Sequence, residues 1–152
     1  MDAKDRKILG LLQENAMLTA AEAAVQVGLT TTPCWRRIQR LEAQGYIRNR
    51  VALLDREKMN VGITVFVSVR ANRHAADWVD LFREVVHSTP EIIEAHRLSG
   101  DTDYLLRVVV PSIESFDRVY KKMINELEFT DVSSSFSMEE LKYTTAIPVT
   151  YV

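Results

Sequence analysis

The spacing of apolar residues changes near residue 61, and this change limits the folds that are open to the chain. Before that point, apolar residues such as Ile8, Leu11 and Leu12 recur every three to four positions, which predicts amphipathic helices. After it, every second residue of one stretch is apolar, which predicts a strand with one buried face: Ile63, Val65, Val67 and Val69. We therefore expect an α+β protein in which a helical N-terminal domain precedes a mixed one.

Three short helices are expected in residues 1–52. The first runs from about Asp2 to Asn15. The second opens at Thr19, which with Glu22 fits a capping box, in which each side chain satisfies a backbone N–H of the other residue. Thr30 is suited to the N-cap of the third helix, and Gly45 is suited to its C-terminal end.

The third helix is expected to have one apolar face and one basic face. Cys34, Ile38 and Leu41 follow the spacing of a buried stripe. The opposite side presents side-chain types that bind phosphates and base edges, with Trp35 on the flank: Thr32, Arg36, Gln39 and Arg40. The segment 46–52 alternates apolar and basic residues, which predicts a short hairpin or wing that exposes Arg48 and Arg50.

Charge is distributed unevenly along the chain. Residues 1–52 hold eight Lys and Arg against five Asp and Glu, although the whole chain has a net charge of -2. A basic cluster on a small unit joined to an acidic body is typical of a nucleic-acid-binding module, but a solvated helix face has the same composition. Together with the third helix, the pattern predicts a winged helix–turn–helix that enters the major groove. A three-helix packing module without a DNA role is the alternative.

The remainder of the chain is expected to form a second domain at 62–152, after a linker at 53–61. Strands are predicted at 61–70, 92–98, 104–110 and 132–142, and helices around 78–85 and 116–127. The order βαββαβ predicts a ferredoxin-like fold, in which two helices cover one face of an antiparallel sheet. We expect the other face to be apolar and to be buried in a dimer.

Several classes of protein are disfavoured by composition. Cys34 is the only cysteine, so the chain has no intrachain disulfide and no Cys-rich zinc site. His74, His87 and His96 lie on three predicted elements, so we expect no metal site and no cofactor. The longest apolar stretches fall far short of the roughly 20 residues of a membrane span. The charged residues 1–7 are unlike a signal peptide, so we expect a cytoplasmic protein without a membrane partner. No nucleophile–base or acid–base pair stands out, and we do not expect an enzyme.

Short motifs in both halves resemble the Lrp/AsnC family of regulators, in order and over nearly the whole chain. In the first half they are Ile8-Leu9, Val27-Gly28-Leu29-Thr30, Thr32-Pro33-Cys34, Arg36-Arg37-Ile38, Arg40-Leu41-Glu42, Gly45-Tyr46-Ile47 and Ala52-Leu53-Leu54. In the second half they are Ser99-Gly100-Asp101-Thr102-Asp103-Tyr104-Leu105-Leu106 and Met138-Glu139-Glu140-Leu141-Lys142.

The resemblance implies a transcriptional regulator of the feast-or-famine type. Such proteins bind double-stranded DNA upstream of genes of amino-acid metabolism, respond to a free amino acid, and form homodimers that often assemble into tetramers or octamers. It implies that the DNA contacts come from Thr30, Thr31, Thr32, Trp35, Arg36, Arg37, Gln39, Arg40, Arg48 and Arg50.

The resemblance also implies an effector pocket in the second domain at an inter-subunit interface. It would be formed by the glycine–aspartate turn and the last strand, with Ile113 as a further candidate: Ser99, Gly100, Asp101, Asp103, Tyr104, Phe136 and Ser137. The carboxylate of Asp101 suits the ammonium group of an amino acid. Aspartates beside a glycine also suit a simple turn.

Two departures from the family pattern lie at the end of the third helix that faces DNA. Thr30-Thr31-Thr32 stands where many members have Ser-Pro-Thr or Ser-Pro-Ser, and Trp35 replaces a smaller apolar residue. The operator sequence therefore cannot be transferred from other members. The alternative function is an architectural protein that wraps DNA with low specificity, and the ratio of specific to non-specific affinity at fixed salt separates the two.

Overall fold

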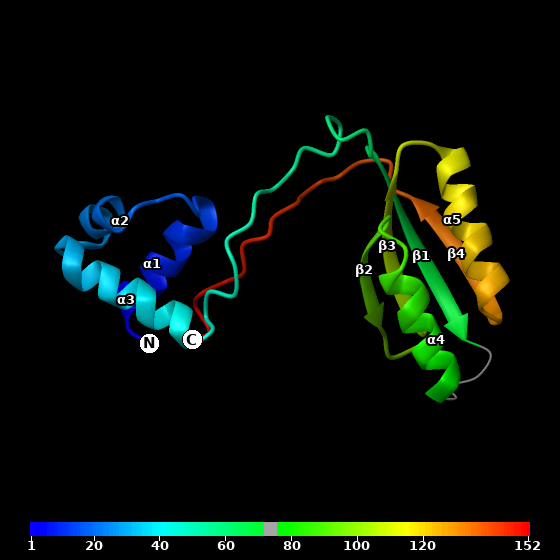
Figure 1. Cartoon of the computed structure of the whole chain (residues 1–152), viewed down its shortest axis with the longest axis horizontal. Coiled ribbons are helices and arrows are strands. Elements are labelled where there is room, and N and C mark those ends of the chain that lie inside the picture. The colour runs from blue at the N-terminus through cyan, green and yellow to red at the C-terminus, as the bar shows by residue number, and fades with distance from the viewer. Residues whose placement is uncertain (72–75) are drawn as a thin grey trace. The chain divides into compact units, whose positions relative to one another are not determined.

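The chain consists of two compact units in the computed structural model, which describes residues 1–71 and 76–152. Unit 1 comprises Met1–Leu53 together with Lys142–Val152, and unit 2 comprises Leu54–Leu141. Helices α1 to α3 belong to unit 1, and strands β1 to β4 with helices α4 and α5 belong to unit 2 (Figure 1). None of the helices within the described residues is both long and apolar enough to cross a membrane.

Unit 1 is built on the three helices α1 (Ala3–Glu14), α2 (Ala20–Val27) and α3 (Thr31–Ala43). Their apolar faces meet in one buried cluster of Ile8, Leu9, Leu12, Ala23, Ala24, Val27, Cys34, Ile38 and Leu41. The inward face predicted for the third helix is therefore confirmed. Burial raises the pKa of the Cys34 thiol, which keeps it protonated as a small apolar side chain of the core.

The residues at the ends of α2 and α3 adopt the capping roles that the sequence predicted, except that the side chain of Thr30 forms no capping hydrogen bond. Thr19 and Glu22 form the predicted capping box at the start of α2. Gly28 adopts φ 66° at the end of α2, a left-handed conformation that glycine tolerates, and it allows the tight turn into α3. Thr30 occupies the N-cap of α3, but its side chain makes no capping hydrogen bond. Gly45 follows the C-cap residue of α3 with φ 75°, close to where the sequence placed the end of the helix.

The segment 46–52 contains no strand, so the expected hairpin is not formed within these described residues. The amides of Tyr46 and Ile47 both donate to the carbonyl of Leu41, which closes the end of α3. The guanidinium of Arg50 donates to the carbonyl of Ala16 at 2.7 Å and to Glu42 at 3.0 Å. Arg50 thereby ties the segment to α3 and to the turn after α1.

Residues 142–152 group with unit 1, although the sequence pattern assigned them to the second domain. Val149 packs against the helical cluster of unit 1. The side-chain amide of Gln13 on α1 donates to the carbonyl of Ile147 at 3.1 Å and accepts from its N–H at 2.7 Å. Arg6 donates to the carbonyl of Val152 at 2.9 Å. The last strand ends at Phe136 and not near Lys142, and residues 142–152, which we call the C-terminal tail, bond to α1 instead.

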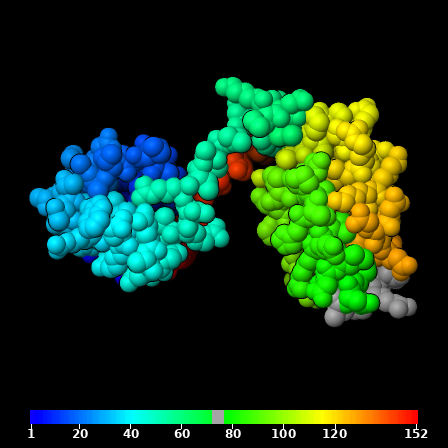
Figure 2. All heavy atoms as spheres, viewed as in Figure 1, coloured from blue at the N-terminus to red at the C-terminus, as the bar shows by residue number. Residues whose placement is uncertain are grey.

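Unit 2 has the predicted βαββαβ order: β1 (Ile63–Ala71), α4 (Ala76–His87), β2 (Ile92–Arg97), β3 (Tyr104–Val110), α5 (Ile113–Glu126) and β4 (Phe129–Phe136). The strand order β2-β3-β1-β4, with every pairing antiparallel, confirms the ferredoxin-like arrangement. Atoms of α4 (green) and α5 (yellow) cover the visible face of the unit in Figure 2.

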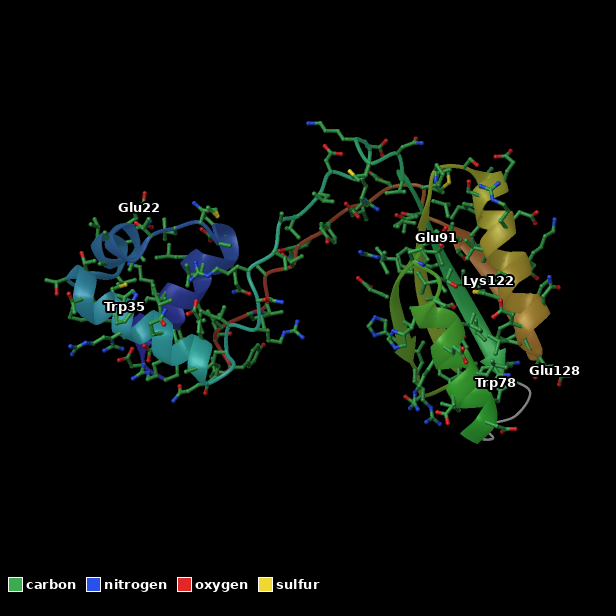
Figure 3. The ribbon with its side chains drawn as sticks, viewed as in Figure 1. Glu22, Trp35, Trp78, Glu91, Lys122 and Glu128 are labelled. Atoms are coloured by element: carbon green, nitrogen blue, oxygen red, sulfur yellow. The ribbon has the colours of Figure 1, made fainter. Side chains whose placement is uncertain are left out.

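The core of unit 2 lies between the sheet and these two helices. Val65, Val67 and Val69 of β1 are fully buried there, as the alternation predicted. They pack with side chains from β3 and from both helices, among them Leu106, Val108, Phe82, Phe116 and Met123. Trp78 of α4 donates its indole N–H to the carbonyl of Glu128 at 2.9 Å, and the two residues lie beside each other in Figure 3.

The other face of the sheet is mixed and not apolar as we expected. The register places Phe66 of β1 beside Arg107 of β3 and Ser135 of β4. Arg107 forms an ion pair with Glu94 at 3.2 Å, whereas Phe66 is 39% exposed. The expectation was wrong because it rested on the helix-facing residues of each strand, and the residues between them on β4 include serines.

Candidate functional site

The face of α3 opposite the buried cluster is open to solvent. Thr32, Arg36 and Gln39 recur along it and are exposed, because they alternate with the buried Cys34 and Ile38 at helical spacing. Trp35 lies on its flank with 52% of its surface exposed (Figure 3). Thr30 and Thr31 are exposed at the start of the helix. The structure therefore brings this part of the predicted DNA-contacting set onto one surface of unit 1.

Two arginines of the predicted set are bound to α1 instead of being free. Nη1 of Arg37 lies 2.6 Å from Oδ2 of Asp2 and 2.8 Å from Oδ1 of Asp5, and Nη2 of Arg40 lies 2.7 Å from Oδ2 of Asp5. The side chain of Asp5 is only 1% exposed. We call these four residues the α1–α3 ion network. It makes Arg37 chiefly a structural side chain.

The carboxylates of the α1–α3 ion network are held in their charged form. Hydrogen bonds from the backbone of Asp5 and from Arg37 lower the pKa of Asp2 to about 2. Burial alone would raise the pKa of Asp5, but hydrogen bonds from Asp2 and Arg37 and the charge of Arg40 lower it. Bonds to the same two carboxylates raise the pKa of Arg37. The network is therefore fully ionised at neutral pH.

The other arginines and the glutamine of the predicted DNA-contacting set differ in whether their side chains already form hydrogen bonds or ion pairs. Arg36 and Arg48 form no hydrogen bond or ion pair within residues 1–71 and 76–152 and are exposed. Arg50 is held by Ala16 and Glu42, and the side-chain amide of Gln39 donates to Glu42 at 3.0 Å. Among the described residues, Arg36 is thus the unpaired cation on the exposed face of α3, and Arg48 lies beyond the C-terminal end of that helix.

Sequence reasoning missed Asp5, although a signal for it was present. Asp5 precedes Ile8, Leu9 and Leu12 at the spacing of a single helix face, so it lies on the buried side of α1. A carboxylate on an apolar face requires a partner, and the arginines on the predicted third helix were available. The partner could not be chosen from the sequence, because the packing of α1 on α3 decides which arginine comes within reach.

In unit 2, the turn of the predicted effector set is tied to the end of β1. Oδ2 of Asp103 accepts from the N–H of Ala71 at 2.9 Å. The backbone N–H of Asp103 donates to the carbonyl of Val69 at 3.0 Å. Arg70 donates to the carbonyl of Asp101 at 2.7 Å. Gly100 adopts φ 125°. Asp103 therefore has a structural role at this turn, which also exposes Ser99 and Asp101.

The two aromatic members of the effector set differ in burial: Tyr104 lies in the core, whereas Phe136 is 40% exposed. Tyr104 is buried, with its ring centroid 4.4 Å from that of Phe82. Its hydroxyl finds no hydrogen-bond partner in the part of the chain that the structure describes. Phe136 packs edge-on against Phe116, with ring centroids 5.4 Å apart.

One chain does not bring the two halves of the effector set together. Asp103 bonds to β1 at Val69 and Ala71, whereas the N–H of Ser137 donates to the carbonyl of Thr64 at 2.9 Å. These points lie at opposite ends of β1, roughly 20 Å apart at the rise of a strand. The two halves therefore do not line one pocket within a single chain.

A separate cavity of about 470 Å³ opens between α4 and β2. Tyr104 is the member of the predicted effector set that lines it, together with His87, His96 and Arg97. Across the two described stretches of the chain, no group of three His, Cys, Asp or Glu side chains is arranged to hold a metal. His74 lies outside the described residues.

Comparison with known proteins identifies both units. The family model of the AsnC-type helix–turn–helix domain matches residues 1–42, and that of the Lrp/AsnC ligand binding domain matches residues 64–147. The glutamate uptake regulatory protein of Zymomonas mobilis is 52% identical over 149 residues, which cover 98% of this chain and 91% of that protein.

Solved structures show the same fold over the whole length. An AsnC family transcriptional regulator from Agrobacterium tumefaciens is 56% identical with a TM-score of 0.95, over 99% of each chain. A transcriptional regulator from Neisseria meningitidis in complex with L-Met is 36% identical with a TM-score of 0.93, over 99% of this chain and 98% of that one. The chain belongs to the Lrp/AsnC family of transcriptional regulators.

Proposed function

We propose that unit 1 binds double-stranded DNA through the exposed face of α3, and that a free amino acid bound to unit 2 modulates this binding. The observation that carries the proposal is the exposed face of α3, where Arg36 is unpartnered within the described residues and Thr32 and Gln39 lie beside it. Guanidinium, hydroxyl and amide groups on one helix face match the phosphates and base edges of a major groove. DNA-binding regulators of this kind act in the compartment that holds the DNA, which for a bacterial regulator is the cytoplasm.

The residues of this face have different proposed roles. Arg36 is the cation that reads a base or binds a phosphate, and Arg48 adds a phosphate contact beyond the helix. Arg37 holds α3 to α1 and is not a DNA contact. Thr30, Thr31 and Thr32 approach the DNA at the N-terminal end of α3, where backbone N–H groups favour phosphates.

Binding is tested by fluorescence anisotropy on DNA from upstream of the protein's own gene and on a scrambled duplex, at two salt concentrations. Arg36→Ala should cost about 1–3 kcal/mol and relax specificity at one position if the side chain reads a base. If it binds only phosphate, affinity should fall evenly on both duplexes. Arg83→Ala in unit 2 removes the same charge from an exposed pair with Asp80 and should leave binding unchanged. Unchanged binding by the Arg36 variant would remove this face from the interface.

A low-specificity architectural role is the second candidate, because exposed arginines bind any duplex. Equal, steeply salt-dependent affinity for both duplexes would favour it. Preference for the upstream fragment, altered by amino acids, would favour the regulator.

An amino-acid effector is supported by the relatives. The Zymomonas protein is named for glutamate uptake, and the Neisseria protein was solved with L-Met. We propose that Ser99, Gly100, Asp101 and Asp103 at the turn of one subunit and Phe136 and Ser137 of another form the pocket, since these groups lie at opposite ends of β1. Asp101→Ala should abolish the response of DNA binding to single amino acids while leaving DNA affinity intact. Unchanged ligand affinity, measured by calorimetry, would contradict the assignment.

Self-association is proposed to occur through unit 2, as a homodimer and as tetramers or octamers built from it. Phe66 is an exposed apolar side chain on the open sheet face, and charging such a position disrupts an interface. Phe66→Lys should therefore lower the mass measured by light scattering. A mass equal to that of the unmodified protein would place the interface elsewhere.

A further inference from the structure

The buried carboxylate of Asp5 joins α1 to two arginines of α3. Oδ1 accepts from Arg37 at 2.8 Å, and Oδ2 accepts from Arg40 at 2.7 Å and from the N–H of Asp2 at 3.0 Å. The side chain of Asp5 is 1% exposed, but that of Arg40 is 49% exposed. One nitrogen of the Arg40 guanidinium is therefore anchored inside unit 1 while much of the group faces solvent.

A guanidinium anchored in this way is oriented before any ligand arrives. It carries five N–H donors in a planar fork, and the bond to Asp5 occupies Nη2. Because the fork is planar, fixing Nη2 also limits the directions that the other donors can take. An arginine that is already ordered loses less rotamer entropy when it binds.

The α1–α3 ion network also balances charge next to the exposed face of α3. Asp2 and Asp5 carry two negative charges, and Arg37 and Arg40 carry two positive charges. The network is therefore neutral as a whole and adds little attraction toward a distant polyanion. Loss of one carboxylate would add a net positive charge close to that face.

We propose that Asp5 is a positioning residue for DNA recognition, which directs Arg40 toward the bound duplex and suppresses sequence-independent attraction by neutralising Arg37 and Arg40 beside the exposed face of α3. The inference rests on the proposed binding of DNA by α3. In this arrangement Asp5, a buried acidic residue of α1, controls the sequence specificity of DNA binding.

The chain offers a matched control in Asp2. Asp2→Asn removes the same charge and retains a side chain that caps helices well. Asp2 contacts Arg37 at 2.6 Å but is not bonded to Arg40. Asp5→Asn removes the charge that anchors Arg40 with almost no change in volume. The two variants thus add equal charge and differ in whether Arg40 stays anchored.

The test measures anisotropy of the full-length variants on the upstream fragment and the scrambled duplex over a series of salt concentrations, with circular dichroism to follow unfolding. Asp5→Asn should bind the scrambled duplex more tightly, with a salt slope steeper by up to about one phosphate contact. Its ratio of specific to non-specific affinity should fall roughly 10-fold, as for loss of one positioned contact. Asp2→Asn should gain non-specific affinity with little change in the ratio.

Equal weakening on both duplexes by Asp5→Asn, with an unchanged ratio and salt slope, would overturn the proposal and leave Asp5 with a purely structural role. Should that variant unfold, Arg40→Lys decides the question, because lysine keeps the charge but lacks the planar fork. It should lower the ratio of specific to non-specific affinity, and an unchanged ratio would overturn the proposal. Failure of the unmodified protein to bind either duplex would overturn the proposed function as well. Failure of the Asp5 inference alone is recognised because the unmodified protein then still binds DNA.

Discussion

The two units stabilise themselves by different means. Unit 2 has a sheet whose alternating valines form a continuous buried layer under two helices. Unit 1 has a smaller helical cluster and adds polar links around it: the α1–α3 ion network and the bonds from Gln13 and Arg6 to the C-terminal tail. Short helices bury few side chains each, so their packing gains from such links.

The ion pairs of Asp5 in unit 1 are more buried than two pairs on the surface of unit 2. In unit 2, the pairs Arg83–Asp80 and Lys121–Asp117 join side chains that are each more than half exposed, and such pairs contribute little to stability. In unit 1, Asp5 is almost fully buried and each of its oxygens accepts a hydrogen bond. A buried carboxylate is tolerated only when it is satisfied in this way. The pairs of Asp5 with Arg37 and Arg40 therefore define how α1 packs on α3, whereas the two exposed pairs of unit 2 define little of its structure.

Truncation of the sheet core should produce the largest effect and confine it to unit 2. Leu106 is fully buried between the sheet and the helices, and Leu106→Ala should lower the free energy of unfolding by about 2–5 kcal/mol. Urea titration with hydrogen exchange read separately for each unit measures this. Equal destabilisation of unit 1 would show that the two units unfold as one and are not stabilised separately.

Removal of the link between α1 and the tail should have a moderate effect in unit 1. Gln13→Ala deletes two hydrogen bonds to Ile147 and should cost about 1–2 kcal/mol. Exchange at residues 147–152 should accelerate. Gln39→Ala removes a bond only to Glu42 within α3 and serves as the control, with little change expected. If both variants behave alike, the tail adds nothing to unit 1.

Two threonines at helix N-caps should differ in their effect. Thr19 accepts a hydrogen bond from the N–H of Glu22, whereas Thr30 makes no such bond. Thr19→Ala should therefore destabilise unit 1 by about 1 kcal/mol, and Thr30→Ala by much less. Thermal unfolding followed by circular dichroism compares them. A larger loss for Thr30→Ala would show that its side chain caps α3 in solution.

Acid should weaken the α1–α3 ion network through Asp2 and Asp5. Both carboxyl groups have a lowered pKa in the folded chain, about 2 for Asp2 against an ordinary 3.8. The unfolded chain therefore binds more protons between the two values for Asp2, so the stabilisation from Asp2 is complete above about pH 4 and is lost as pH falls toward about 2. The lowered pKa of Asp5 acts in the same direction. Unfolding of unit 1 measured from pH 5 downward tests this. Asp2→Asn should flatten the profile, and an unaltered profile would refute the role of Asp2.

The exposed face of the candidate site could be predicted from the sequence, but the partners of its arginines could not. The exposed face of α3 followed from the spacing of Cys34, Ile38 and Leu41, because a helix that buries one stripe must expose the opposite one. That Arg37 and Arg40 are bound to α1 did not follow from it, since helical spacing says nothing about partners on another helix. The hairpin at 46–52 was wrong because alternation alone does not supply a second strand.

The effector set shows the same division. Its turn at Gly100 was predicted from residue types that favour turns, and β4 was predicted from alternation. Their separation at opposite ends of β1 depends on strand register, which is set when the sheet pairs. The assignment of residues 142–152 to unit 1 depends on contacts with α1 from the far end of the chain.

The sequence by itself determined the order of helices and strands, the capping box of Thr19 and Glu22, the inward faces and the ferredoxin-like arrangement. These features depend on residues close together in the chain, whose periodicity matches that of a helix or a strand. Only the tertiary structure decided which arginines are free, where the tail packs and how far apart the effector residues lie. Those features join residues distant in sequence, and they exist only once the helices and strands have packed against one another.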